Sequence, residues 1–351
     1  MKHDFIKIRF DLQLFAGEVV PGNAAGNMMT SGSSELDPEF GKINDEQFLR
    51  MHESQLIFNK FGAKTLIPDN SGVTARYFIK KHIDPIKTSL EEGKTPQPNK
   101  FTIEAKTASI EQYGDWIMFT DVATKTSIHN LMVQVRQPQS YQSAKTRNLL
   151  IRDELMSSAQ AAYASKTSAP DAEIDDIADL TIECKLTVKE VQKMANRLRR
   201  NDIAPAEGGD YIMIVHPDVL FDLKQDPAWK DWNSPQNAVK FEKGEVGRVD
   251  GVRFVETTIA GITKEEGQAG GLAVYHNLIF GADAYAVLDM ENGGTKVIVK
   301  TLGSAGTADP LDQRCSVGWK FWNGAAVLDD LAIFDLMCCS YMSAVESVVS
   351  N

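Results

Sequence analysis

The sequence predicts an α+β fold, and three features of the chain support this prediction. Runs of apolar, aromatic and β-branched residues end at tight-turn dipeptides such as Asp250-Gly251 and Asn323-Gly324, a pattern typical of antiparallel strands. Apolar residues between Tyr141 and Tyr163 recur at helical spacing, which indicates a long amphipathic helix. Strands and helices do not alternate regularly, so a doubly wound parallel sheet is disfavoured.

The C-terminal region contains the clearest turn signal. An apolar and aromatic run from Cys315 to Trp322 precedes Asn323-Gly324, and a second apolar run from Ala325 to Leu328 follows. Asn and Gly both tolerate the positive φ angles of a type I′ turn. We therefore expect a hairpin centred on Asn323-Gly324, in a chain that ends in a strand pair.

Composition places the chain among ordinary globular proteins. It has 351 residues, 43% hydrophobic and 24% charged, enough to bury a large core in two lobes or in one lobe with long arms. The formal net charge of −11 argues against a protein that holds duplex DNA through clustered Lys and Arg. An acidic surface is compatible with a protein that encloses DNA without binding it tightly.

No zinc site, disulfide framework or membrane segment is expected. The four cysteines lack CxxC spacing and paired histidine ligands, so buried free thiols are predicted at Cys184, Cys315, Cys338 and Cys339. Charged residues interrupt the N-terminus, which argues against a secretory signal, and no apolar run approaches the roughly 18 residues of a membrane helix. We expect a protein that works inside a cell, without membrane contact.

The N-terminal region combines a polar tether with an apolar cluster. Residues 17–38 are rich in Gly, Asn, Ser and Pro and cannot bury enough surface to offset their ordering entropy. Leu12, Leu14 and Phe15 precede this tether and need a partner surface, so an arm is predicted, with a merely disordered tail as the alternative. Loose helical spacing from Asn44 to Phe61 predicts a short helix.

A long hairpin is expected between residues 73 and 111. Thr74 to Ile83 is rich in aromatic and β-branched residues, and Phe101 to Ile110 alternates with the period of a half-exposed strand. The loop between them is polar and contains three prolines. An isolated ribbon is marginal in water, so the hairpin either folds back on its own sheet or lies on a neighbouring subunit.

Two helices follow. Between Tyr141 and Tyr163 the apolar stripe consists of Ala144, Ile151, Leu155, Ala159 and Ala162, and the charged residues, Arg147 and Arg152 among them, are expected off this stripe. The second helix begins with a capping box, Thr187 to Glu190. Its last turn contains Arg197, Arg199 and Arg200, which we interpret as surface residues that complement the helix dipole rather than as a DNA-binding patch.

Further strands are predicted downstream. Tyr211 to Val215 has the composition of a buried strand, and a short helix around Val219 follows it directly. The segment 247–257 predicts a hairpin with Asp250-Gly251 at its turn. Strands are also expected at 272–275, 286–288 and 296–301.

Candidate chemistry is sparse, and we predict no catalytic, cofactor-binding or metal-binding residues. His216, beside Asp218, is the one position where a general base can be argued, but a His before Pro at a strand end is usually a turn residue. The acidic stretch Asp171 to Asp179 lacks the Gly and Glu of an EF-hand and is interpreted as a solvated linker. The Gly-Gly pairs at 208, 270 and 293 match no nucleotide-binding motif.

The order of these segments resembles major capsid proteins of tailed bacteriophages. The resemblance rests on Phe10 to Ala16, Gln112 to Trp116, the 247–257 hairpin and the strand Val317 to Lys320, together with the extended loop and the long helix. Among these proteins, the chain most resembles the family typified by coliphage N4, which has the Hong Kong 97-type capsid fold. The resemblance implies six regions: an N-terminal arm (1–45), a short helical segment joining the arm to the P domain (46–72), an extended-loop hairpin (73–111), a P domain with a spine helix (112–200), an A domain (201–310), and a return to the P-domain sheet with a C-terminal tail (311–351).

The resemblance implies a shell subunit without an active site. Pentamers and hexamers of the chain would form the icosahedral head around double-stranded DNA, which it would contact non-specifically. Scaffold, portal and decoration proteins are possible partners, and a separate scaffold, or none, would guide assembly. The virion is the expected location, after assembly in the bacterial host cytoplasm. The alternatives are an encapsulin-like compartment of the same fold and a soluble hydrolase with a site around His216.

Overall fold

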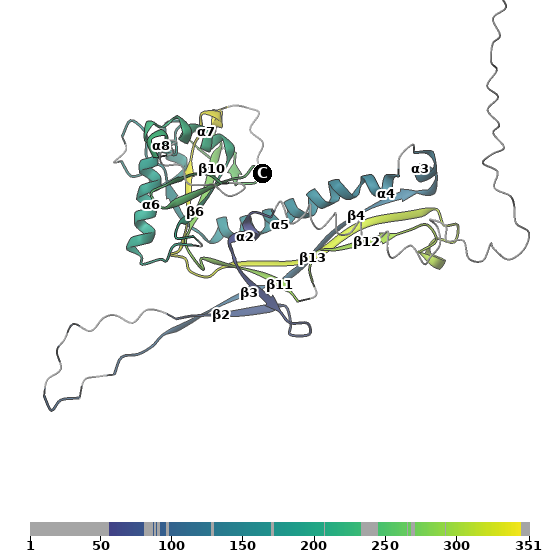
Figure 1. Cartoon of the computed structure of the whole chain (residues 1–351), viewed down its shortest axis with the longest axis horizontal. Coiled ribbons are helices and arrows are strands. Elements are labelled where there is room, and N and C mark those ends of the chain that lie inside the picture. Colours follow the sequence, from purple (N-terminus) through teal and green to yellow (C-terminus); the bar gives the residue numbers. More distant parts are fainter. Residues whose placement is uncertain are drawn as a thin grey trace, which may run out of the picture. The chain divides into compact units, whose positions relative to one another are not determined.

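The computed structural model describes a large part of the chain downstream of residue 55 (Figure 1). The described residues are 56–80, 87, 89, 92–95, 98–127, 130–169, 172–206, 208–232, 245–264, 266–267, 271–291 and 293–344. They belong to one compact unit, Phe48–Asn351. The expected arm and the first part of the expected 44–61 helix lie outside the described residues.

The first of two large sheets has five strands. In order these are β1 (Ala63–Ile67), β11 (Tyr285–Met290), β13 (Arg314–Val327) and β12 (Lys296–Lys300), with β4 (Glu111–Thr120) also paired to β13. β1 is parallel to β11, and the other pairs are antiparallel. The sequence did not predict β1, which directly follows the short helix α2 (Phe58–Phe61).

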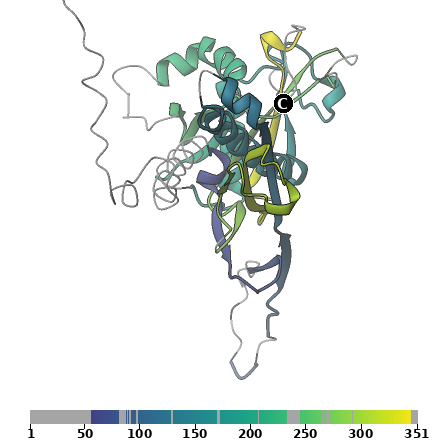
Figure 2. The same ribbon diagram turned by 90° about the vertical axis from the view of Figure 1, so that its right-hand side faces the viewer.

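The long helix α5 (Arg136–Ser158) runs along β13 (Figure 1; Figure 2). The predicted apolar stripe is confirmed at Ala144, Ile151 and Leu155, which are fully buried. The predicted start of the helix was too late, because α5 begins at Arg136. Pro138 is compatible with this start, since it lies in the first turn, where no backbone N–H is needed. It ends at Ser158, and Ala162, assigned to the stripe, lies in strand β5 (Gln160–Tyr163) instead.

Two arginines of α5 are buried, contrary to the expectation that they lie off the apolar stripe. Arg147 forms an ion pair with Asp289 of β11, and its Nε donates to Asn323 Oδ1 at 3.3 Å. Arg152 donates to the carbonyl oxygen of Ile259 at 2.9 Å. Polar partners from distant parts of the chain therefore offset the cost of removing these charges from water.

The predicted turn at Asn323-Gly324 was wrong, because β13 passes straight through it. Asn323 pairs with Glu111 of β4, and Gly324 pairs with Leu288 of β11. A Cβ at position 324 would collide with the carbonyl oxygen of Ser109, so this glycine allows a close backbone approach rather than a turn. The chain reverses later, around Asp330.

The second large sheet has seven strands. In order these are β5, β14 (Ile333–Cys338), β10 (Val274–Phe280), β6 (Tyr211–Val215), β8 (Val252–Glu256) and β7 (Glu245–Val249), with β9 (Ile262–Thr263) paired to β10. One core contains Val191, Met194 and Leu198 of α6 (Val188–Arg200) with Met213 and Phe254 of the sheet. A second core contains Ile151 and Leu155 of α5 with Ile212, Ile214 and Leu278. Helix α5 therefore contributes to the core of both sheets.

Several local predictions in this sheet are confirmed. Thr187 caps α6, its hydroxyl accepting the Glu190 N–H at 3.4 Å. Asp250 and Gly251 have φ angles of 47° and 74° and connect β7 to β8. All five residues of β6 are buried, and α7 (Pro217–Gln225) follows as expected.

The last strands of the chain are divided between the two large sheets. Strands β11 and β12 pair in the sheet of β13, whereas β14 lies in the seven-stranded sheet. The remaining short elements are α3 (Asp121–Thr126), α4 (Leu131–Gln134), α8 (Pro227–Trp232), η2 (Ile177–Asp179), η4 (Gly306–Ala308) and η5 (Tyr341–Ala344). Within the described part of the chain, the apolar stretch needed for a membrane-spanning helix is not found in any helix.

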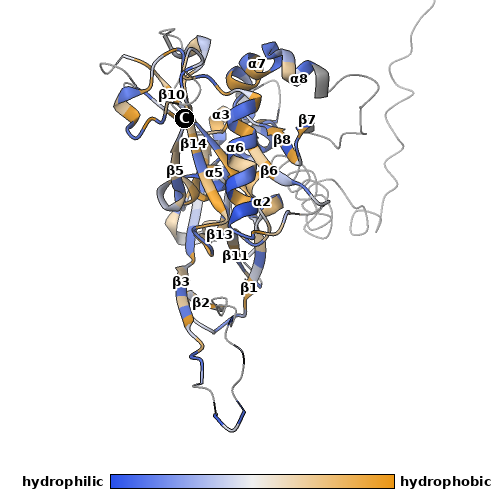
Figure 3. Ribbon diagram, turned by 90° about the vertical axis from the view of Figure 1, so that its left-hand side faces the viewer, coloured by the Kyte–Doolittle hydropathy of each residue, from blue (hydrophilic) through white to orange (hydrophobic). Residues whose placement is uncertain are grey.

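The predicted hairpin pairing between residues 73 and 111 is confirmed. β2 (Thr74–Lys80) and β3 (Ile103–Ser109) pair antiparallel and form a two-stranded sheet, which we call the ribbon. Hydrophobic and hydrophilic residues alternate along much of β3 (Figure 3). One face of the ribbon packs near its base on the five-stranded sheet, through Ala75, Tyr77 and Ala108.

Candidate functional site

The part of the five-stranded sheet formed by β4, β13 and β12 has two unlike faces. Val317, Trp319 and Phe321 of β13 are buried on the side of α5, where Trp319 Nε1 donates to Gln142 Oε1 at 3.3 Å. Alternate residues of a strand point to opposite faces, so Gly318 and Lys320 lie on the other side. Trp319 is therefore buried against the long helix.

The opposite side, which we call the open sheet face, carries exposed apolar and basic residues. The strand register puts Trp116 of β4 and Ile298 of β12 on either side of Gly318, and Lys296 beside Lys320. Trp116 and Met118 are 62% and 49% exposed. A Cβ at Gly318 would lie 2.7 Å from the Cβ of Trp116, so the glycine makes room for the tryptophan. The open sheet face consists of Trp116, Met118, Lys296, Ile298, Lys300 and Lys320.

The ribbon also exposes apolar residues on one of its faces. Phe78 is 64% exposed and pairs with Ala105, while Ile103, further along the same face, is 52% exposed. The prediction that β3 is half-exposed was wrong for this part of the strand, because its apolar face has no cover within the chain. Lys106, on the other face, is tied to Asp330 by an ion pair of 2.6 Å.

His216, the candidate general base, is the N-cap of α7. Its Nδ1 accepts the Asp218 N–H at 3.3 Å, and Pro217 occupies the first helical turn. Burial lowers the pKa of His216, although the Asp218 carboxylate opposes that shift. Asp218 in turn accepts a hydrogen bond of 2.8 Å from the Tyr275 hydroxyl. His216 therefore caps α7, and Asp218 links this helix to Tyr275 of the sheet, which is the structural role expected of a turn residue.

The acidic stretch forms no metal site among the residues that the structure describes. Asp176 caps η2 by accepting the Ala178 N–H at 3.3 Å, and no group of three His, Cys, Asp or Glu side chains is placed to hold an ion. Asp171 lies outside the described residues. The acidic stretch is therefore partly a capping sequence.

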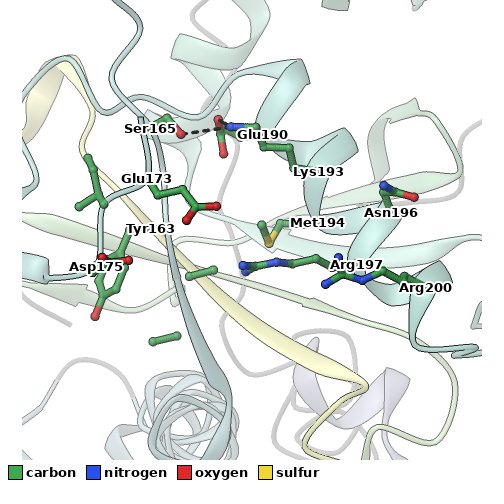
Figure 4. Close-up of a pocket in the computed structure, with 13 residues that line it drawn as sticks. Tyr163, Ser165, Glu173, Asp175, Glu190, Lys193, Met194, Asn196, Arg197 and Arg200 are labelled. Carbon is green, nitrogen blue, oxygen red and sulfur yellow. Dashed lines mark hydrogen bonds and ion pairs between the residues drawn. The ribbon is translucent and has the colours of Figure 1, made fainter. Parts of the chain in front are cut away.

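A pocket of about 750 Å³ lies between this stretch and α6 (Figure 4). Glu173 and Asp175 line one side, and Arg197 and Arg200 the other. Lys193 is engaged with Glu190 at 2.8 Å and with Ser165 at 3.2 Å. Charges of both signs face each other across the pocket, which gives no preference for a ligand of one charge.

The basic last turn of α6 contacts its own subunit. Arg199 pairs with Asp250 at 3.2 Å, and the Arg197 guanidinium lies 6.0 Å from the centre of the Phe334 ring. Arg197, Arg199 and Arg200 lie on the surface, as predicted. The four cysteines are buried and unpaired, as expected.

One buried polar cluster was not predicted. His276 Nδ1 lies 2.6 Å from Asp335 Oδ2, and its Nε2 lies 3.0 Å from Thr263 Oγ1, which ties β9, β10 and β14 together. Asp335 and His276 are 1% and 6% exposed, so the cluster is closed to a substrate. The sequence signal was weak, because the three residues are far apart in the chain and belong to no motif.

Comparison with known proteins identifies the family of the chain. The phage capsid protein family matches residues 103–336, more than half of the chain. No curated protein matches the chain in sequence.

Solved phage capsids share the fold. The capsid protein of the cyanophage P-SCSP1u has a TM-score of 0.59 at 13% identity, over 81% of this chain and 88% of that chain. The capsid of Ralstonia phage GP4 gives 0.59 at 13%, over 79% and 86%. The capsid of Helicobacter pylori bacteriophage KHP30 gives 0.57 at 12%, over 79% and 88%. The chain therefore belongs to the phage capsid protein family and is a structural capsid subunit with the Hong Kong 97-type fold.

Proposed function

We propose that this chain is the major capsid protein of a tailed phage of the coliphage N4 type, and that its pentamers and hexamers form the icosahedral shell around double-stranded DNA. Assembly takes place in the bacterial cytoplasm, with scaffold, portal and decoration proteins as candidate partners. The protein does no chemistry in this role. The family match favours a phage head over an encapsulin-like compartment.

The exposed face of the ribbon is the observation that carries the proposal. Phe78 and Ile103 are each more than half exposed on a two-stranded sheet that pairs with no third strand among the described residues. A two-stranded ribbon is marginally stable in water unless a surface covers it. A neighbouring subunit supplies such a surface in a shell.

The energy of one such contact is small, and repetition makes it effective. Burial of Phe78 or Ile103 on a neighbour is worth about 1.5–3 kcal/mol per side chain before ordering costs. A heterologous contact repeated around a ring closes a capsomer, and contacts between rings then add avidity. Weak contacts also allow a wrongly placed subunit to leave during assembly.

Net charge is consistent with a container rather than a DNA-binding protein. The chain carries a formal charge of −11, and the arginines at the end of α6 contact its own residues. DNA contact in the proposed particle is therefore non-specific.

Deletion of residues 86–99 tests the role of the ribbon. We expect the shortened chain to fold, because the two large apolar cores and the smaller cluster at the base of the ribbon lie outside this loop, but to form no shells under electron microscopy. A second variant, Phe78→Ser with Ile103→Thr, changes only exposed side chains and should also abolish assembly at unchanged thermal stability.

The matched control is Phe221→Ser on α7, which is 58% exposed and lies away from the ribbon. It should assemble normally. Shells of normal size from both ribbon variants would refute the proposed role of the ribbon, and the absence of any particle from the unmodified chain would refute the proposed function.

A further inference from the structure

The pocket beside α6 lies at a free edge of the seven-stranded sheet. Strand β5 is the outermost strand of that sheet and pairs only with β14 within the described part of the chain. Residues 161–163 of this strand line the pocket. Its volume of about 750 Å³ falls within the usual range of ligand sites, about 300–1,000 Å³. The pocket is therefore large enough for a ligand, and an edge strand forms part of its lining.

The outer side of β5 carries free backbone hydrogen-bonding groups. In a parallel pair, alternate residues of a strand bond to the partner strand. The Ala164 N–H donates to the Met337 carbonyl oxygen at 2.9 Å, and the register of the pair makes Ala162 bond to β14 in the same way. The N–H and C=O groups of Ala161 and Tyr163 therefore point outward. Among the described residues these outward groups have no hydrogen-bond partner, so β5 can pair with one more strand.

The sequence of β5 does little to block this edge. Natural edge strands are commonly protected by charged side chains, proline or a β-bulge. β7, at the other edge of the same sheet, carries Glu245 and Arg248 and has a register shift between Glu245 and Gly247. β5 has the sequence Gln-Ala-Ala-Tyr, with neither a charged residue nor a proline. Only its length of four residues limits the pairing of a further strand.

The pocket has two oppositely charged walls (Figure 4). Arg197 and Arg200 of α6 form the basic wall, and Glu173 and Asp175 form the acidic wall. No ion pair joins the two walls, and none engages any of these four side chains elsewhere in the part of the chain that the structure describes. The walls are therefore available to a ligand that carries charges of both signs.

The two walls lie beside opposite faces of the sheet. Ala162 belongs to the core that α6 covers, together with Met194, so the basic wall is on this side. Tyr163 and Ile174 pack on a separate cluster that contains Cys339, and Ile174 is the residue between the two carboxylates of the acidic wall. Successive residues of a strand point to opposite faces. A strand added beside β5 would therefore direct alternate side chains to the basic wall and to the acidic wall.

We propose that the β5 edge binds an extended peptide segment of another protein in which acidic and basic residues alternate. The peptide adds to the sheet as a further strand, and its backbone bonds to Ala161 and Tyr163. Its acidic side chains pair with the basic wall, and its basic side chains pair with the acidic wall. The site is separate from the ribbon and from the open sheet face, so it does not depend on the proposed assembly of the shell.

Two other ligands fit the pocket less well. A phosphate ion would pair with the basic wall, but it would be repelled by Glu173 and Asp175 across the pocket. A small zwitterion would pair with both walls, but it would leave the outward N–H and C=O groups of Ala161 and Tyr163 without a partner other than water. An alternating peptide strand satisfies the charges and the backbone together.

Fluorescence anisotropy of a labelled peptide measures binding to the full chain. The probe is Glu-Lys-Glu-Lys-Glu-Lys with blocked termini, and the control is Glu-Glu-Glu-Lys-Lys-Lys, which has the same composition without the alternation. We expect the alternating peptide to bind about tenfold more tightly, because the control directs charges of both signs to each wall. Equal affinities, or no binding of either peptide, would overturn the proposal.

N-methylation of the peptide separates backbone pairing from charge pairing. In an added strand, the N–H groups of alternate residues point to β5, so these residues are either all glutamates or all lysines. One peptide is methylated at its lysine amides and the other at its glutamate amides. We expect one of them to lose binding and the other to keep it. Equal affinities of the two methylated peptides, whether kept or lost, would overturn the addition of a strand.

Charge reversal in the protein tests the walls. Arg197→Glu with Arg200→Glu should weaken binding of the alternating peptide about tenfold. Adding Glu173→Lys and Asp175→Lys should restore it, because the peptide shifted by one residue then matches both walls.

The matched control for this test is Lys224→Glu with Lys230→Glu, which reverses two exposed lysines of α7 and α8 and should leave binding unchanged. If the double arginine variant does not fold, Arg200→Glu alone keeps the contact of Arg197 with Phe334 and gives the same test. Unchanged binding in a folded variant of the basic wall, or no rescue by the lysine substitutions, would contradict the proposal.

Discussion

Replacement of Trp319 by alanine tests how the long helix is held on its sheet. The indole is 4% exposed, stacks on Phe321 with ring centres 5.3 Å apart, and donates to Gln142 of α5 at 3.3 Å. Removal of a buried Trp side chain costs about 3–5 kcal/mol in transfer free energy and cavity. The lost hydrogen bond leaves the Gln142 amide oxygen able to reach water at the helix surface, so it adds little. We expect the free energy of unfolding to fall by about 4 kcal/mol.

Urea denaturation of free subunits, followed by circular dichroism, measures this change as a shift in midpoint. The control is Trp116→Ala, the same substitution on the adjacent strand but on the opposite face, where the indole is 62% exposed. It should cost no more than about 0.5 kcal/mol. A loss below about 1 kcal/mol for Trp319→Ala, or equal losses for the two tryptophans, would refute the placement of β13 beneath α5.

Two further substitutions test local features. Gly324→Ala should destabilise the subunit by about 1–3 kcal/mol, because the added Cβ would clash with the Ser109 carbonyl oxygen. The control is Gly294→Ala, whose Cβ would meet nothing within 4 Å and which should be neutral. Equal unfolding midpoints for the two variants would contradict the close approach of Gly324 to the backbone at Ser109. Burial lowers the pKa of His216 below its ordinary 6.5, so the unfolded chain binds a proton more readily than the folded chain. The stability that is present above pH 6.5 is therefore lost as the pH falls toward the pKa of the folded state. His216→Asn keeps a capping side chain and should flatten this part of the stability curve between pH 8 and 5, and an unchanged slope would show that other groups cause it.

Features set by neighbours in the sequence were predictable. The Thr187 cap of α6 depends on a residue three positions away, and the Asp250-Gly251 turn depends on two adjacent residues with positive φ. The buried strand Tyr211 to Val215 is apolar on both faces, which fits its position inside the seven-stranded sheet. In each case the local preference and the tertiary structure agree.

Asn323-Gly324 shows where local reasoning fails. The dipeptide has the residues of a type I′ turn, yet Asn323 is 3% exposed and accepts from Arg147, and Gly324 lies against the backbone at Ser109. Both partners are more than 170 residues away in the sequence. The same distant contact explains why Arg147 is buried, although its position relative to the apolar stripe predicted exposure.

The exposed surfaces were harder to predict than the buried ones. Phe78, Ile103 and Trp116 have the composition of strand core residues, and sequence periodicity gives their face but does not show whether anything covers it. The open sheet face needs the register of three strands from distant parts of the chain before its lysines appear side by side. The pocket beside α6 is lined by charges of both signs, which gives no preference for a ligand of one charge.

The two tryptophans at the centre of this sheet show how one strand pattern serves folding and assembly at once. Trp319 pairs in register with Asp115 of β4, and Trp116 is the next residue of that strand. The two indoles therefore belong to adjacent cross-strand pairs and point to opposite faces of the sheet. The inner one is enclosed by the subunit's own helix. The outer one is exposed in the subunit and is available to a partner surface. Because its burial is worth only a few kcal/mol, about 1.5–3 for a large apolar side chain, a single contact is reversible and a complete shell is not.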